Sequence, residues 1–279
     1  MPVPHKSILI TGCSSGIGLD AAWRMRARGW QVIASARRAE DVAKLAAEGF
    51  AAVRIDYEEE ASIQDGLAEA LKQTGGQLGV LFNNGAYAIP SAVEDLPTAA
   101  LRQIMQANFF GWHSLTRAVV PVMTAQGGGR IIQNSSILGF VGLRFRGAYV
   151  ASKFALEGLS DVLRLELAGS GVEVVLIEPG PIRTRIRQNS WPHFQNWIDW
   201  RGTRLEAVYQ SKLIPRLTAP DGPPDRFELG PEAVSDALVH ACEAGRPRLR
   251  YRITRATQYM ALAKRITTGR LLDRLLVRL

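Results

Sequence analysis

The feature that most restricts the fold of this chain is a regular alternation of short apolar runs with segments of helical spacing. Apolar runs with the length and composition of buried strands occur at 6–12, 30–36, 50–56, 78–84, 129–136 and 172–180. Segments of helical spacing separate them, at 17–29, 39–49, 61–73, Pro97 to about Met123, and Tyr149 to Ala168. Short connections between such elements predict an α/β fold, a Rossmann-type doubly wound parallel sheet with helices on both faces.

Residues 185–230 interrupt this alternation. They carry prolines, charges and three of the six tryptophans, Trp191, Trp197 and Trp200. We interpret the segment as a helical substrate cap inserted after the sixth strand, at the carboxyl end of the sheet where α/β proteins bind ligands. Its tryptophans could cover an apolar pocket, or they could pack in the core or against another subunit. A further helix and a last strand follow within the same single domain, 1–279, at 231–244 and 249–254.

Basic residues concentrate at the C-terminus. Residues 245–279 hold ten Lys/Arg and one acid, whereas the rest of the chain is nearly neutral within a net charge of +8. Over 255–279 the pattern predicts one basic amphipathic helix, in which Arg270, Arg274 and Arg278 form a stripe. Such a helix could lie on an anionic membrane surface, or its leucines could pack on the domain or on a partner subunit. No recognition motif accompanies the charge, so we do not expect nucleic-acid binding.

The number of cysteines and the length of the apolar runs indicate where in the cell the protein is expected. Cys13 and Cys242 make neither a disulfide framework nor a metal-ligand cluster, so no metal site is expected. The first residues lack the charged start, long apolar run and cleavage site of a signal peptide. No apolar run reaches the roughly 18 residues of a membrane span. We therefore expect a cytoplasmic protein in a reducing compartment, with membrane contact only at the periphery, through the tail.

The connection between the first strand and the first helix reads TGCSSGIG, residues 11–18. Gly12 would allow a tight turn, Gly16 would let the backbone approach a pyrophosphate, and Gly18 would let the helix pack closely on the strand. The helix N-terminus would add free N–H groups and the positive end of its dipole. The spacing G-x-x-x-G-x-G differs from the common dinucleotide fingerprint, and a plain structural turn is the alternative. The strand before the loop and the helix after it favour a dinucleotide site.

The end of the second strand bears on the choice of cofactor. A carboxylate there would bond a ribose 2′-hydroxyl and repel a 2′-phosphate, but this chain has Arg37 and Arg38. Guanidinium groups suit a phosphate, so we predict NADP rather than NAD. The arginines could instead only cap or solvate the second helix. Asp56, at the end of the third strand, is placed either to accept a hydrogen bond from an adenine amino group or to stabilise a turn.

Several short motifs occur in a fixed order along the chain. They are TGCSSGIG, then NNGA at 83–86, Asn108, Ser136, the pair Tyr149-x-x-x-Lys153, and PGPIRT at 179–184. In this order they resemble the short-chain dehydrogenase/reductase superfamily, closely over about 6–184 and loosely beyond. The stretches FFGWHSLTRAVVP and EPGPIRT and the basic tail resemble bacterial members near the 17β-hydroxysteroid and retinol dehydrogenases. Those enzymes act on lipophilic alcohols, ketones and aldehydes.

The resemblance implies a catalytic set and a set of cofactor contacts. The catalytic set is Asn108, Ser136, Tyr149 and Lys153. With the residues argued above, the expected NADP(H) contacts are Gly12, Ser14, Ser15, Gly16, Ile17, Gly18, Arg37, Arg38, Asp56, Asn83, Gly85, Tyr149, Lys153, Pro179, Gly180 and Thr184. The resemblance also implies a homodimer or homotetramer through the two long helices. Family members usually have Asn-Asn-Ala-Gly where this chain ends the motif with Gly85-Ala86, and alanine at a site of positive φ would cost about 1 kcal/mol.

The spacing of Tyr149 and Lys153 carries the predicted chemistry. Residues i and i+4 share a helix face, so the Lys153 ammonium would lie beside the Tyr149 phenol. A neighbouring positive charge favours the phenolate, so we expect the pKa of Tyr149 to fall below its ordinary value near 10, as suits a general acid/base. By resemblance, Lys153 also bonds the nicotinamide ribose, and Ser136 holds the substrate oxygen.

Three further side chains have two interpretations each. By resemblance, Asn108 holds a water that connects Lys153 to solvent; the alternative is a buried helix hydrogen bond. Thr184 could touch the nicotinamide carboxamide or cap a helix. Ser135 points to the other face of its strand from Ser136, which indicates a structural or cofactor-positioning role.

These residues together predict hydride transfer between NADP(H) and a small, lipophilic carbonyl or alcohol, such as an aldehyde, a retinoid or a steroid-like ketone. One alternative is a non-catalytic NADP(H)-binding sensor of redox state, which would have no need of Tyr149 and Lys153. Another is a scaffold held at a membrane surface by the basic tail.

Overall fold

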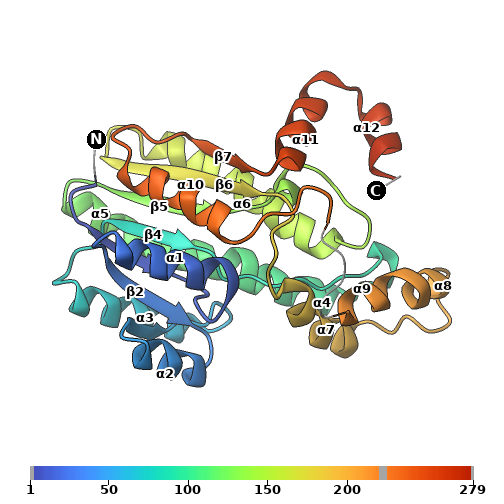
Figure 1. Cartoon of the computed structure of the whole chain (residues 1–279), viewed down its shortest axis with the longest axis horizontal. Coiled ribbons are helices and arrows are strands. Elements are labelled where there is room, and N and C mark those ends of the chain that lie inside the picture. The colour runs from blue at the N-terminus through green and yellow to red at the C-terminus, as the bar shows by residue number, and fades with distance from the viewer. Residues whose placement is uncertain (1–2, 220–224, 278–279) are drawn as a thin grey trace.

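The computed structural model describes residues 3–219 and 225–277. Its centre is one seven-stranded sheet in the order β3-β2-β1-β4-β5-β6-β7, in which every neighbouring pair is parallel (Figure 1). The strands are β1 (Ser7–Ile10), β2 (Gln31–Ala36), β3 (Ala51–Arg54), β4 (Val80–Asn83), β5 (Gly129–Asn134), β6 (Val172–Pro179) and β7 (Arg250–Ile253). The strand order reverses between β1 and β4, which places the expected ligand crevice at the carboxyl ends of these two strands. The predicted fold class is confirmed.

Helices cover both faces of the sheet. One layer holds α1 (Gly16–Ala27), α2 (Ala39–Ala47) and α10 (Glu232–Glu243), and the other α3 (Glu60–Gln73), α5 (Gly111–Ala125) and α6 (Gly147–Glu166). Successive strand residues point to opposite faces, so Ile8 and Ile10 of β1 join the first apolar layer and Leu9 joins the second. All three are fully buried. Burial on both faces explains why β1 is an unbroken apolar run and not an alternating one.

The single long helix predicted from Pro97 to about Met123 is interrupted. The structure has α4 (Thr98–Met105), then a π-helical turn, η2 (Gln106–Phe110), and then α5. A π turn closes its hydrogen bonds over five residues instead of four, so it accommodates one more residue than a regular turn. Apolar periodicity does not reveal such a turn, and Asn108 lies within it.

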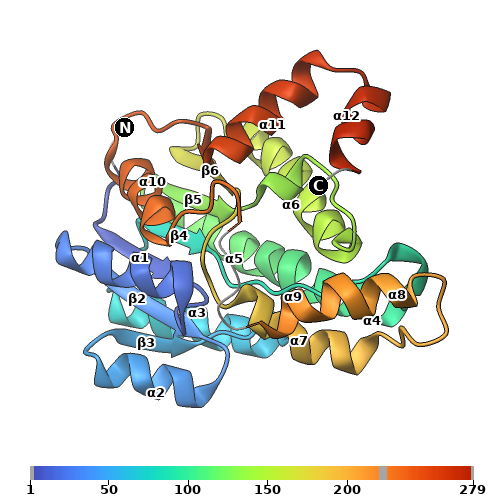
Figure 2. The same cartoon turned by 45° about the vertical axis from the view of Figure 1, so that its right-hand side comes forward.

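The cap region is helical, as predicted for 185–230. It comprises α7 (Ile186–Trp197), α8 (Glu206–Val208), the π-helical turn η4 (Tyr209–Leu213) and α9 (Ile214–Thr218), which lie together beside α4 (Figure 2). Residues 220–224 of this prediction lie outside the described part of the chain. The tryptophans pack against a third apolar cluster, whose buried members include Phe194 and Tyr209. The packing alternative for these rings is therefore observed, and a role above a substrate stays a prediction.

The tail forms two helices, and the prediction of one continuous helix over 255–279 is wrong. The structure has α11 (Arg255–Ile266) and α12 (Gly269–Leu276), joined by Thr267 and Thr268, whose ψ angles of 154° and 155° are extended. Two β-branched residues followed by a glycine have poor helix propensity, which accounts for the break. α11 packs on β7, whereas α12 contacts α11 and has no buried residue. Arg278 and Leu279, also in the prediction, lie outside the described residues.

Within the described ranges, none of the helices combines the length and the apolar character that crossing a bilayer would require. The shorter helical turns are η1 (Val93–Asp95) and η3 (Ile137–Gly139). η3 lies between the end of β5 and α6, beside the carboxyl edge of the sheet, and therefore next to the expected site.

Candidate active site

The glycine loop has the geometry of a backbone cradle. Gly12 and Gly16 have φ angles of +70° and +58°, a region that side chains disfavour. A Cβ on Gly18 would lie 2.3 Å from the main-chain oxygen of Gly12, so only glycine lets α1 start this close to β1. Ser15, at the N-cap, makes no side-chain cap bond, and the first turn of α1 holds no acid. The N-terminus of α1 therefore offers N–H groups and a positive dipole end to an anion, which fits the pyrophosphate of a dinucleotide.

The loop after β4 lies against the glycine loop. A Cβ on Gly12 would lie 2.6 Å from the Cα of Gly85, so the two glycines are in backbone contact. Neither Gly85 nor Ala86 has a positive φ, and the strain considered for the reversed Gly-Ala order is absent. Asn84 ties the loops together, because its Nδ2 donates to the main-chain oxygen of Thr11 at 2.9 Å and its Oδ1 accepts from Asn134 at 2.8 Å.

The side chain of Asn83 does not reach the loop surface. It is fully buried, its Oδ1 accepts from the Tyr57 hydroxyl at 2.6 Å, and its Nδ2 donates to Thr116 and Gln133 at 3.0 Å each. The polar atoms of this side chain are thus bonded within the protein. Asn83 supports the end of β4 from the core, in contrast to the direct cofactor contact predicted for it.

The two arginines after β2 have different surroundings. Both are exposed, and Arg38 is the N-cap residue of α2, with Nη1 3.4 Å from a carboxylate oxygen of Glu40. The main-chain oxygen of Arg37 accepts a hydrogen bond of 3.0 Å from Nε of Arg54. Arg38 thus has a carboxylate neighbour at the start of α2, and contact of either arginine with a 2′-phosphate stays a prediction.

Asp56 follows β3 and stabilises a turn. Its Oδ1 accepts a hydrogen bond of 3.0 Å from the main-chain N–H of Glu58, and its Oδ2 lies 3.8 Å from Arg54. The turn role left open by the sequence is therefore present. A bond from this carboxylate to an adenine amino group stays a prediction.

Tyr149 lies in the first turn of α6, opposite the end of β5. Its ring packs against the apolar cluster under the cap. Burial raises the pKa of Tyr149 to about 12, and a hydrogen bond with Ser136 offsets part of this rise. The prediction that Lys153 lowers the pKa of this phenol is wrong for this structure, because loss of solvent outweighs the attraction. The phenol is consequently protonated at neutral pH.

Ser136 and Ser135 point in different directions, as predicted from strand alternation. Ser136 has an extended backbone, and its Oγ accepts from the N–H of Leu138 at 3.1 Å while it also reaches Tyr149. Ser135 occupies the space between Gly139 and Glu157. The structure thus brings Ser136, and not Ser135, to the phenol.

Lys153 is buried, with 1% of its surface exposed. Its Nζ donates to the main-chain oxygen of Asn134 at 2.8 Å and lies 5.6 Å from the centre of the Tyr149 ring. Burial lowers the pKa of Lys153 to about 7, and the carboxylate of Glu157, one turn further along α6, opposes this effect. The ammonium is therefore only partly charged near neutrality, which explains its weak influence on the phenol.

Asn108 is fully buried within the π turn. Its Nδ2 donates to the main-chain oxygen of Tyr87 at 2.8 Å, and its Oδ1 accepts from the N–H of the same residue at 3.2 Å. Both polar atoms thus hold the backbone that follows the Gly85 loop. The buried hydrogen-bond role left open by the sequence is observed, and the water-holding role stays a prediction.

The loop after β6 faces the glycine loop. A Cβ on Gly16 would lie 3.3 Å from the Cγ2 of Thr184, so Thr184 lies directly across the crevice. Its Oγ1 also accepts from the N–H of Ile186 at 3.4 Å, next to the start of α7. Gly180, after Pro179, is held by a 3.0 Å bond from its N–H to the oxygen of Ile253. All three residues follow or end β6 at the carboxyl edge of the sheet, and their contact with a nicotinamide stays a prediction.

A family model for short chain dehydrogenases matches residues 6–194, more than half of the chain. The chain belongs to the short-chain dehydrogenase/reductase family. It is therefore an oxidoreductase with an NAD(P)-binding Rossmann fold, and the motif order that resembled this family is confirmed as its signature.

Known members of the family resemble the chain over most of its length. The uncharacterized oxidoreductase YbbO of Escherichia coli K12 is 39% identical over 98% of this chain and 95% of its own. Human retinol dehydrogenase 8 is 30% identical over 90% of this chain and 82% of its own. A solved short-chain dehydrogenase from Streptomyces avermitilis has a TM-score of 0.75 at 28% identity, and the match covers 93% of this chain and 92% of that one.

In this short-chain dehydrogenase/reductase, the sequence motifs left out several residues that surround the site. Trp112 lies four residues after Asn108, and its ring faces Lys153. Tyr87 stacks on His193 with ring centres 4.0 Å apart, and its hydroxyl donates to Glu58 at 3.1 Å. The Tyr87–His193 contact joins distant segments, and no local pattern announces it.

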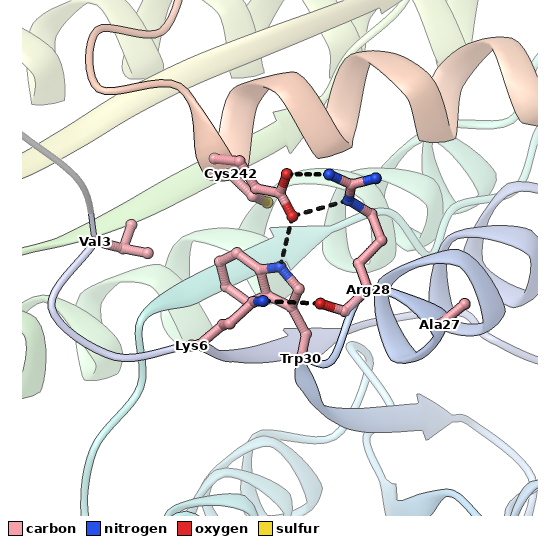
Figure 3. Close-up of a pocket in the computed structure, with 7 residues that line it drawn as sticks. Val3, Lys6, Ala27, Arg28, Trp30 and Cys242 are labelled. Atoms are coloured by element: carbon pink, nitrogen blue, oxygen red, sulfur yellow. Dashed lines mark hydrogen bonds and ion pairs between the residues drawn. The ribbon is translucent and has the colours of Figure 1, made fainter.

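A separate cavity of about 560 Å³ lies at the opposite edge of the sheet (Figure 3). It is lined by Val3, Lys6, Ala27, Arg28, Trp30, Cys242 and Glu243. The Glu243 carboxylate accepts from the Trp30 indole at 3.1 Å and from Arg28 at 2.8 Å. These contacts tie α10 to the connection between α1 and β2, and they lie at the amino end of β2, away from Tyr149. The cavity is therefore structural and not part of the active site.

Proposed function

We propose that this protein is an NADP(H)-dependent oxidoreductase for lipophilic carbonyl compounds and the corresponding alcohols. The observation that carries the proposal is the convergence of Ser136, Tyr149 and Lys153 at the carboxyl edge of the sheet, opposite the glycine loop. The apolar cluster on which Tyr149 packs supports a lipophilic substrate. The name of its relative retinol dehydrogenase 8 supports a retinoid as a compound to test, beside the steroid-like ketones and aldehydes expected from the sequence.

Ser136 and Tyr149 have different roles in the proposed reduction of a carbonyl group. When bound, the reduced nicotinamide supplies the hydride. Negative charge then develops on the carbonyl oxygen of the substrate, and Ser136 and Tyr149 are positioned to donate hydrogen bonds to it. Tyr149 transfers its proton as general acid.

Lys153, Asn108 and Thr184 complete the proposed site. Lys153 would bond the ribose next to the nicotinamide and return a proton to Tyr149. Asn108 would hold the water that supplies Lys153 from solvent. Thr184, with Pro179 and Gly180, would contact the nicotinamide end of the cofactor, and Arg37 would bind the 2′-phosphate that distinguishes NADP from NAD.

We propose a homodimer formed through the helices that carry these residues. Apolar side chains that are 41–73% exposed lie on η2 and α6, namely Phe110, Phe154, Val162 and Leu165. Exposed apolar patches of this kind mark interaction surfaces. Light scattering of the purified protein gives the assembly mass, and a monomeric mass would contradict the proposal.

The C-terminal helices favour a peripheral membrane contact in addition. Leu271 and Leu275 of α12 are exposed in the structure, whereas Leu272 and Leu276 are partly buried, which supports a surface role for one side of this helix. Arginines lie beside these leucines, as is typical of helices that rest on anionic lipid. The enzyme would then act as a cytoplasmic protein that can dock at a membrane surface.

The deciding experiment follows NADPH oxidation with long-chain aldehydes, retinal and ketosteroids, with NADH in parallel. Turnover with NADPH that falls 10²- to 10⁴-fold in Tyr149→Phe would support the proposal. Near-full activity of that variant would contradict the assigned mechanism. Tight NADPH binding without turnover across the panel would favour the alternative, a non-catalytic sensor.

A further inference from the structure

The tail helix α11 contacts the loop that leads from β5 to α6. Lys264 of α11 donates from Nζ to the main-chain oxygen of Phe140 at 2.6 Å. Phe140 is the C-cap residue of η3, and Ser136 is its N-cap residue. The bond joins positions that are 124 residues apart in the sequence. The tail is thus connected to the short element that begins at a residue of the proposed active site.

Within the described parts of the chain, the bond from Lys264 is the one hydrogen bond that ties residues 137–144 to a distant segment. The other hydrogen bonds of this stretch are local. The N–H groups of Phe140 and Val141, for example, donate to the main-chain oxygen of Ile137 at 3.2 and 3.1 Å. Local bonds fix the shape of a turn but not its place on the domain. Packing and the bond from Lys264 therefore set where η3 lies.

η3 is closely packed on one side and borders a cavity on another. Against α6, a Cβ on Gly139 would lie 2.6 Å from the Oγ of Ser135 and 2.9 Å from the Cγ of Glu157, which is too close for any side chain. The cavity, of about 580 Å³, is lined by η3 together with α6 and α11, which lie side by side (Figure 2). The Nζ of Lys264 reaches across it to η3 and lies 5.2 Å from the centre of the Phe154 ring on α6, a cation–π distance. Lys264 therefore restrains η3 on the side where packing is incomplete.

The position of η3 determines where the Ser136 hydroxyl points. The Oγ of Ser136 accepts from the N–H of Leu138 at 3.1 Å, and its main-chain oxygen accepts from the N–H of Gly139 at 2.9 Å. Ser136 is thus bonded twice to η3, and it also reaches Tyr149. A displacement of about 1 Å in a group that holds a reacting atom can cost about 10²-fold in rate. A smaller displacement of η3 is therefore enough to lower turnover.

We propose that Lys264 is a positioning residue: it holds η3 through Phe140, so that the Ser136 hydroxyl stays aligned with the Tyr149 phenol. The inference rests on the proposed reductase function and extends it, because it makes the C-terminal tail part of the support of the active site. Lys264 itself touches neither Ser136 nor Tyr149, and its effect passes through the backbone of η3.

The test compares three variants of the full-length enzyme in the absence of lipid. Lys264→Met keeps most of the alkyl stem and removes the donor, whereas Lys264→Arg restores a charged donor. Arg265→Met is the matched control, since Arg265 is the next residue, is also exposed and carries the same charge. With the best carbonyl substrate of the panel, we expect kcat to fall about 3- to 10-fold in Lys264→Met, as the loss of one charge-assisted bond permits. The KM for NADPH should not change, Lys264→Arg should recover most of the loss, and Arg265→Met should behave as the wild type.

Hydrogen exchange followed by mass spectrometry measures the position of η3 without any turnover. In Lys264→Met the amides of residues 136–146 should exchange several-fold faster, while those of residues 60–73 in α3 keep the wild-type rate. Lys264→Arg and Arg265→Met should both match the wild type in the two segments. Faster exchange in α3 as well would indicate general destabilisation and would contradict a local role for Lys264.

Two results would overturn the inference and leave the reductase intact. One is unchanged exchange of residues 136–146 in Lys264→Met, which would show that packing alone holds η3. The other is faster exchange of that segment with an unchanged kcat, which would show that the place of η3 does not matter to Ser136. Absence of turnover in the wild type across the whole panel would instead contradict the proposed function, and the exchange rates would still decide whether Lys264 holds η3.

Discussion

The ammonium of Lys153 lies 4.1 Å from the centre of the Trp112 ring. The negative face of an indole attracts a cation, and the attraction reaches about 2 kcal/mol or more where water is excluded. The bond from Lys153 to the oxygen of Asn134 fixes a second direction. The lysine is thus oriented by the protein itself, before any ligand contributes. Trp112 in turn is anchored by its own N–H, which donates to the oxygen of Gly85 at 2.9 Å.

Replacement of Trp112 separates these two contacts. Trp112→Phe keeps an aromatic face and loses the bond to Gly85, whereas Trp112→Leu loses both. We expect Trp112→Leu to reduce kcat by about 10- to 30-fold, since about 2 kcal/mol of cation stabilisation is removed, and Trp112→Phe to reduce it by much less. Steady-state kinetics at saturating NADPH measures both. A similar loss in the two variants would assign the effect to the loop and not to Lys153.

The buried lysine makes stability depend on pH in a defined direction. The pKa of Lys153 is lowered to about 7 from an ordinary value near 10.4, so between these values the unfolded chain binds more protons than the folded one. Stability therefore rises with pH from 7 to about 10, and the penalty present below pH 7 is at most about 5 kcal/mol. The substitution Lys153→Met should remove this pH dependence, and denaturant unfolding at a series of pH values measures it. The gap in stability between the variant and the wild type should shrink as pH rises, and a gap that is constant from pH 6 to 10 would contradict the assignment.

Two glycines provide a matched test of the cradle. A Cβ on Gly18 would lie 2.3 Å from Gly12, whereas a Cβ on Gly158 in α6 would meet nothing within 4 Å. Gly18→Ala should lower the free energy of unfolding by about 1–3 kcal/mol and weaken NADPH binding, since α1 must move away from the loop. Gly158→Ala should raise the free energy of unfolding by up to about 1 kcal/mol, because alanine has a higher helix propensity than glycine. Unfolding curves with and without NADPH report both effects.

Exchange of Arg37 tests the choice of cofactor. Arg37→Ala should raise the KM for NADPH about 10- to 100-fold and leave that for NADH nearly unchanged, because a charge-assisted contact to the 2′-phosphate is lost. Arg38→Ala is the internal control, since Arg38 lies beside Glu40 at the start of α2. Equal effects of the two variants on NADPH would mean that the arginines act only through general positive charge.

Vesicle flotation tests the role of α12. The variant Leu271→Glu/Leu275→Glu places charge on the exposed apolar side chains of this helix, and it should abolish flotation with vesicles that contain anionic lipid. Val93→Glu, at an even more exposed apolar residue outside the tail, should float as the wild type does. High salt should weaken binding, since part of it is electrostatic. Retention of flotation by the α12 variant would remove the membrane proposal and favour a protein partner for this helix.

The sequence pattern correctly predicted those features that depend on contacts between residues close together in the sequence. The approach of Gly18 to Gly12, the strand periodicity and the Tyr149–Lys153 spacing each reflect contacts within one turn or one strand. The pKa of Tyr149 was predicted in the wrong direction, because spacing reveals a neighbouring charge but not the amount of solvent excluded around it. Burial is a property of the assembled cap, which depends on residues 35 to 70 positions away in the sequence. For the same reason no pattern placed Trp112 against Lys153.

The cofactor contacts show the same limit at single residues. Asn83 and Asn84 are adjacent and identical, so the sequence cannot tell which one faces the core. The hydrogen bonds of Asn83 to Tyr57, Thr116 and Gln133 decide it, and these partners come from three distant segments. The break between α11 and α12, by contrast, could have been predicted locally from Thr267, Thr268 and Gly269, but the regular arginine spacing that follows it was given more weight.

The π turn η2 rotates the side chains of α5 around the helix axis relative to those of α4. One surplus residue in a helix advances every later side chain by about 100° around the axis, so α4 and α5 present faces that an uninterrupted helix of the same sequence would not align. Loss of a single codon between Gln106 and Phe110 would restore regular winding and rotate the cap-facing side of α4 out of phase with Trp112. At this point of the chain the count of residues, more than their chemical identity, sets where Asn108 points. Single-residue deletions here are therefore expected to be far less tolerated than substitutions at the exposed positions around them.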